Sequence, residues 1–230
     1  MKSLLSILLC SLFFLQAQAG GPWPTGAKKT YFQLGFSTKT WDGRYEGTYA
    51  NTISYNLNHP VTEHNIGLYG EYGISDQLSL IAESSILHIS TDIKVNADGA
   101  FSQVLPYGEI IGLGSTRISA KYSLDGGKLN KAVLLKVRPN LTSFDEEKGL
   151  KTGYGNWSYT AAISLGQGKD KSYWQFDIGM ELNTNNYADN IVGTAQYGYK
   201  ISPAIHLIAD VNYVISLENG TYDDGNYHHT

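Results

Sequence analysis

Hydrophobic and polar residues alternate with a period of two along several segments of the chain. In 172–184, Trp174, Phe176 and Ile178 fall on one face, whereas Asp177 and Glu181 fall on the other. A helix would scatter these two sets around its circumference, but a strand separates them. The alternation predicts nine strands, at about 28–40, 63–72, 78–90, 112–124, 131–143, 156–167, 172–184, 191–201 and 205–220.

The links between these strands alternate between long and short. The links over 41–62 and 91–111 have 22 and 21 residues, whereas those over 73–77 and 125–130 have five and six. Tight turns at one rim and large loops at the other are typical of an up-and-down barrel. We therefore predict an all-β protein, an antiparallel up-and-down transmembrane β-barrel of about 10–12 strands.

The first 19 residues have the layout of a cleavable secretory signal. Lys2 precedes an apolar run from Leu4 to Leu15, and small residues flank Gln18 just before Gly20. We expect cleavage after Ala19, which leaves residues 20–230 as the barrel domain. The only cysteine, Cys10, lies inside this signal. The exported chain is therefore expected to have neither a disulfide nor a thiolate nucleophile.

Alternation alone does not separate a membrane barrel from an exported soluble sandwich or a lipocalin-like barrel. Three features favour the membrane barrel: the signal, the alternating lengths of the links, and aromatic residues near the segment ends, such as Trp41, Tyr72 and Trp157. The apolar faces also carry almost no charge. We expect the chain to lie in the cell outer membrane, with the lipid bilayer as its partner.

Composition excludes two other classes. The formal net charge is -4, and only 17% of residues are charged, with a sequence pI near 5.8. A nucleic-acid partner is not expected, because such proteins carry a basic excess that neutralises phosphates. A disordered chain would have fewer apolar and aromatic residues than the 42% and 12% found here.

Several segments resemble known outer-membrane families. GLYGEYGISDQLSLIAESSI, at 67–86, and GLGSTRISAKYSL, at 112–124, resemble strands of the barrel family labelled "meta-pathway of phenol degradation". GGPWPTGAKKTYFQLGFST, TGYGNWSYTAAISLG and NNYADN are similar to XagA-like proteins. Ser115 stands where the first family commonly has Asp. The resemblance implies an outer-membrane barrel of a transporter class, without assigned catalytic residues to carry over.

Charged residues on the polar faces are the candidate lumen-lining set. Basic and acidic members come from different strands, which permits two interpretations. They could form opposite walls of a water-filled pore, whose transverse field selects small polar solutes, or a salt-bridged plug that closes the lumen. The residues are Glu71, Glu83, Arg117, Lys121, Lys136, Arg138, Asp177, Glu181 and Asp210, with Glu218 near the end of the chain.

The function that these patterns favour is passive or facilitated diffusion of small-molecule solutes through an outer-membrane barrel. The alternative is a non-conducting surface barrel whose long extracellular loops bind a partner or a polysaccharide. No enzyme activity is expected, because the carboxylates of Asp177 and Glu181 have no identifiable catalytic partner. The six histidines lack zinc-binding spacings, so no metal or cofactor is expected.

The predicted strand number raises a difficulty. Single-chain bacterial barrels have an even number of strands, and nine would leave two unpaired edges in hydrocarbon. We therefore expect either that the chain is a truncated version of a longer barrel and lacks C-terminal strands, or that the prediction misses one strand, at 48–57.

Overall fold

The computed structural model describes residues 21–46, 53–91, 108–124, 127–202 and 205–217. These residues form twelve strands, and none of them belongs to a helix long and apolar enough to cross a membrane. The strands are β1 (Thr30–Glu46), β2 (Ile53–Gly73), β3 (Leu78–Thr91), β4 (Gly108–Leu113), β5 (Arg117–Leu124), β6 (Asn130–Arg138), β7 (Phe144–Asp145), β8 (Leu150–Lys151), β9 (Ser158–Lys169), β10 (Ser172–Asn183), β11 (Asn190–Ser202) and β12 (Ile205–Ser216).

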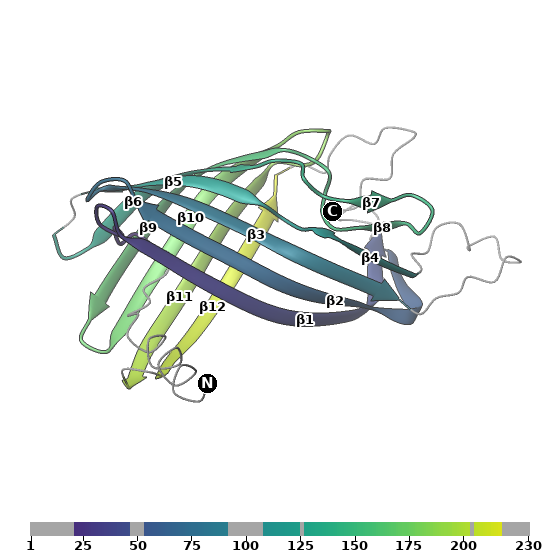
Figure 1. Cartoon of the computed structure of the whole chain (residues 1–230), viewed down its shortest axis with the longest axis horizontal. Coiled ribbons are helices and arrows are strands. Elements are labelled where there is room, and N and C mark those ends of the chain that lie inside the picture. Colours follow the sequence, from purple (N-terminus) through teal and green to yellow (C-terminus); the bar gives the residue numbers. More distant parts are fainter. Residues whose placement is uncertain (1–20, 47–52, 92–107, 125–126, 203–204, 218–230) are drawn as a thin grey trace, which may run out of the picture.

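Ten of these strands form one antiparallel sheet, in which every strand except β4 pairs with the next strand of the sheet along the chain. The order is β1-β2-β3-β5-β6-β9-β10-β11-β12, and β4 pairs with β3. The sheet curls into part of a barrel wall (Figure 1). The expected fold class, an all-β antiparallel up-and-down wall, is confirmed.

All nine predicted strands exist, but three segments of the chain differ from the prediction. The link predicted over 41–62 is mostly strand, because β1 runs to Glu46 and pairs with the start of β2. The strand suspected at 48–57 is not a separate strand, since Ile53–Leu57 opens β2 and residues 48–52 lie outside the described residues. The segment 112–124 is divided into β4 and β5 by a break at 114–116.

The third difference is a small hairpin between β6 and β9. The strand predicted at 131–143 ends at Arg138, and β7 and β8 pair with each other in the link that follows. Leu150 of β8 packs with Val61, Leu87 and Ile89 on the concave face of the sheet. The Thr152 hydroxyl donates a hydrogen bond to the Leu113 carbonyl, which holds the hairpin against β4. Figure 1 shows this hairpin at the right-hand end of the sheet.

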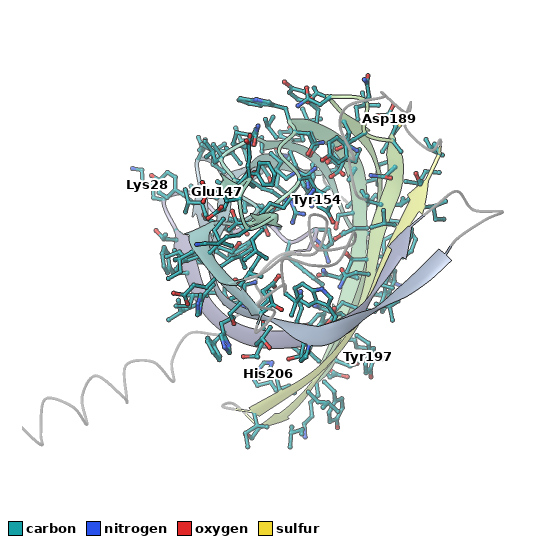
Figure 2. The ribbon with its side chains drawn as sticks, turned by 90° about the vertical axis from the view of Figure 1, so that its right-hand side faces the viewer. Lys28, Glu147, Tyr154, Asp189, Tyr197 and His206 are labelled. Carbon is teal, nitrogen blue, oxygen red and sulfur yellow. The ribbon has the colours of Figure 1, made fainter. Side chains whose placement is uncertain are left out.

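The two faces of the sheet are inverted relative to a water-soluble sheet. The convex face exposes large apolar side chains, among them Phe32, Leu34, Phe36, Ile118, Leu135, Ile163, Ile178, Met180, Leu207 and Val211. The concave face buries polar side chains, among them Ser79, Ser119, Lys121, Ser123, Ser158, Thr160, Ser164 and Gln175. Figure 2 shows Tyr154 within the curve of the ribbon. Contiguous apolar exposure on this scale is unusual for a monomer in water.

Close packing of β9 against β10 generates a prediction about Gly179. A Cβ at this position would stand 2.6 Å from both the Ala162 Cβ and the Ala161 carbonyl oxygen. We expect Gly179→Ala to lower the free energy of unfolding by about 1–3 kcal/mol, as overpacked cores do. Urea unfolding followed by tryptophan fluorescence measures the change.

The matched control is Gly67→Ala in β2, because a Cβ at Gly67 would meet nothing within 4 Å. Both changes add one methyl group to a strand glycine, so the difference isolates the steric cost. Equal loss of stability in the two variants would show that the β9–β10 contact is not the cause.

Candidate functional site

Residues 21–29, called the N-terminal segment below, lie against the concave face at the end of the sheet that carries the tight turns. Two side chains of β5 hold it. The Lys121 Nζ donates to the Trp23 carbonyl at 2.8 Å, and the Ser123 hydroxyl donates to the Pro22 carbonyl at 3.2 Å. Because these bonds reach backbone oxygens, they fix the path of the segment rather than one side chain.

A buried ion pair anchors this contact. The Lys121 Nζ lies 2.7 Å from the Glu71 carboxylate, and each side chain is only 2% exposed. The hydroxyls of Tyr69 and Thr25 also donate to the Glu71 carboxylate, and the Ser79 hydroxyl donates to the Thr25 oxygen. These bonds supply the extra partners that a buried ion pair requires. Since Thr25 belongs to the N-terminal segment, the pair joins the segment to β2 and β5.

Two glycines leave room for the N-terminal segment and for the ring that supports it. A Cβ at Gly166 would stand 2.8 Å from the Pro22 ring, and one at Gly198 would collide with the Tyr173 ring. Tyr173 packs edge-on against Trp23, with ring centroids 5.7 Å apart, and its hydroxyl donates to Gln196. The segment therefore fits against the wall because Gly166 and Gly198 have no side chains, as well as through hydrogen bonds.

A second cluster lies toward the other end of the wall, around Arg138. Its Nη2 donates to the amide oxygens of Asn156 and Asn183, each at 3.2 Å. The Glu181 carboxylate lies 3.9 Å away. The guanidinium also stands over the Tyr154 ring, 5.4 Å from its centroid. Amide, carboxylate and aromatic groups thus surround the Arg138 guanidinium.

Tyr187, in the link between β10 and β11, extends this cluster. Its ring packs edge-on against Tyr154, and its hydroxyl donates to the Tyr154 carbonyl. Burial raises the pKa of Tyr187 above its ordinary value, and the negative form of Tyr154 would raise it further, whereas Arg138 opposes both. The hydroxyl therefore stays a protonated donor at neutral pH.

The predicted lining residues have different surroundings. Lys121 with Glu71, and Arg138 with Glu181, form ion pairs. The remaining members make no ion pair with any residue that the structure describes; these are Glu83, Arg117, Lys136, Asp177 and Asp210. Asp210 accepts a hydrogen bond from Asn212, and one oxygen of Asp177 is buried without a hydrogen-bond partner. Glu218 lies outside the described residues.

The strand register places the members of this set relative to one another. The Lys121–Glu71 pair lies at the turn end, beside the N-terminal segment. Lys136 and Glu181 lie in one row of the sheet with only Thr160 between them, so they occupy neighbouring sectors of one wall. Ile118 pairs with Val137 in an antiparallel ladder, so Arg117, which precedes Ile118, lies beside Arg138, which follows Val137. The role of these residues in lining a pore stays a prediction.

Several residues of these clusters were not predicted from the sequence. Pro22, Trp23 and Thr25 precede the first alternating segment, and only the composition GGPWPTG signals an irregular stretch there. Tyr154 and Tyr187 lie in links, where alternation gives no information. Among the described residues, no group of three or more His, Cys, Asp or Glu side chains could hold a metal ion.

The chain matches no protein-family model and no curated protein. Its fold is similar to the crystal structure of an outer membrane channel from Pseudomonas putida F1, with a TM-score of 0.59 and 15% identity. The match covers 87% of this chain and 77% of that chain. The similarity shows that the wall has the fold of an outer-membrane β-barrel.

The buried pair generates a second prediction. Lys121→Met would leave the Glu71 carboxylate buried without its cation, so we expect a loss of about 3–5 kcal/mol in the free energy of unfolding. The double variant Lys121→Met with Glu71→Gln should be more stable than Lys121→Met alone, because no unpaired charge remains. Urea unfolding of the refolded protein measures both.

Lys128→Met serves as the control, because Lys128 is exposed in the turn before β6. Surface changes of this kind are usually within about 0.5 kcal/mol of neutral. If Lys121→Met costs no more than the control, the pair does not anchor the N-terminal segment.

Proposed function

We propose that this protein is an outer-membrane channel that passes small polar molecules by passive or facilitated diffusion. The observation that carries the proposal is the inverted wall, which exposes large apolar side chains on its convex face and buries polar ones on its concave face. A bilayer stabilises the first face, and a water-containing lumen suits the second. The fold shared with an outer membrane channel supports the same reading.

The lengths of the links orient the wall. The links after β2, β5, β9 and β11 are short and lie at one end, whereas the links after β1, β3, β6 and β10 are longer. Bacterial barrels have short turns on the periplasmic side and longer loops outside. The N-terminal segment then lies at the periplasmic mouth, where it narrows the route for a solute.

Export and family are parts of the same proposal. Cleavage after Ala19 would remove residues 1–19, so the mature chain would begin one residue before Gly21. Gly21 is buried and lies against the Gln175 side chain. We also infer a distant relationship to the phenol meta-pathway barrel family. The two segments that resemble it, at 67–86 and 112–124, correspond to a β2-turn-β3 hairpin and to the broken strand formed by β4 and β5.

Conductance tests the channel directly. We expect the mature protein, refolded in detergent and added to a planar lipid bilayer, to give discrete current steps. Deletion of residues 21–27 should raise the step size several-fold, because the segment bonded to Lys121 and Ser123 would no longer narrow the periplasmic mouth. Both proteins are compared at the same salt concentration and voltage.

The control is a deletion-free variant, Lys128→Gln, which changes an exposed turn at the same end of the wall. Absence of current steps from both the intact and the shortened protein would refute the channel. It would favour instead a barrel that conducts nothing and binds a partner with its loops. Equal step sizes in the intact and shortened proteins would keep the channel but remove the constricting role of the segment.

A further inference from the structure

A hollow of about 370 Å³ lies beside the N-terminal segment at the turn end of the wall. Trp23 and Tyr173 contribute its apolar surface. Its charged and titratable lining comprises Lys169, Lys171, Lys200, His206 and a single carboxylate, Asp170. The hollow therefore carries more positive than negative charge, although the whole chain is acidic, with a net charge of -4.

The strand register brings these cations together. Ser172 pairs with Tyr199, so Lys171 lies opposite Lys200, whose N–H donates to the Lys171 carbonyl at 2.6 Å. Lys200 in turn pairs with His206 of β12. Like charges directly opposite each other destabilise a sheet. Two adjacent lysines and a histidine in one row thus favour a ligand that brings negative charge.

Nothing among the described residues neutralises these lysines. No ion pair within 4.0 Å joins Lys169, Lys171 or Lys200 to a described acidic side chain. By contrast, Lys121, which also contacts the N-terminal segment, forms an ion pair with Glu71. The positive charge of the hollow is consequently available to a bound anion.

The volume of the hollow and its aromatic surface indicate which class of ligand it could bind. Its volume falls within the roughly 300–1,000 Å³ typical of small-molecule sites. The edge-to-face rings of Trp23 and Tyr173 offer an apolar surface beside the lysines. A ligand that uses both surfaces has an anionic end and an apolar body.

We propose that this hollow binds a small organic carboxylate at the periplasmic mouth. The proposal rests on the proposed channel function, because it takes the turn end as the mouth of the lumen. The carboxylate contacts the lysines through charge-assisted hydrogen bonds, and the apolar body packs on Trp23. Binding at such a point holds a solute beside the N-terminal segment and stays weak enough to let it leave.

Binding is measured by isothermal titration of the refolded protein with benzoate and with benzamide, which is close in size but neutral. We expect benzoate to bind about tenfold or more tightly than benzamide, and Lys171→Gln with Lys200→Gln to weaken benzoate binding by a similar factor. The matched control, Lys128→Gln with Lys131→Gln, removes two exposed charges at the same end and should leave benzoate affinity unchanged.

Equal affinities for benzoate and benzamide would overturn the proposal, as would unchanged benzoate binding in the Lys171 and Lys200 variant. Binding of phosphatidylglycerol micelles that the same variant abolishes, without benzoate binding, would assign the hollow to a lipid headgroup and also overturn it. Benzoate binding without any bilayer current would refute the channel but keep the site. Bilayer current without benzoate binding would keep the channel but refute the carboxylate site.

Discussion

The structure depends on the two-residue period that an antiparallel hydrogen-bond ladder imposes on every strand. Paired residues point to the same face of the sheet, so the face of one residue determines the face of its partners along a whole row, except at the register shifts after Trp41 and Lys200. The row through Gly73, Ser79 and Lys121 illustrates this. Gly73 has no side chain and that of Ser79 is small, so Lys121 can reach across β3 toward Glu71 on β2.

Most of the wall could be predicted from the sequence because its signal is local. Apolar and polar residues alternate through Ser158–Leu165 of β9 and Trp174–Leu182 of β10, and each short turn interrupts the alternation. The extension of β1 past Trp41 could not be predicted in the same way. Those residues pair through backbone N–H and C=O groups, which every residue except proline carries, and a register shift occurs between Trp41 and Gly43.

The candidate site was predictable only in part. Alternation assigns Lys121, Glu71, Arg138 and Glu181 to the polar faces, but it does not say which charges meet. Those contacts depend on register between strands far apart in sequence and on the docking of the N-terminal segment. A segment without alternation, such as the one that carries Trp23, gives no advance sign of where it packs.

The N-terminal segment fits against the wall only because two residues of the wall are glycines, which have no side chain. Gly166 makes room for Pro22, and Gly198 makes room for the Tyr173 ring that supports Trp23. Every replacement at these two positions adds volume, and none can remove it. Single substitutions there can therefore loosen the fit of the segment but not tighten it, so mutational drift at these sites runs in one direction, toward a less tightly packed segment.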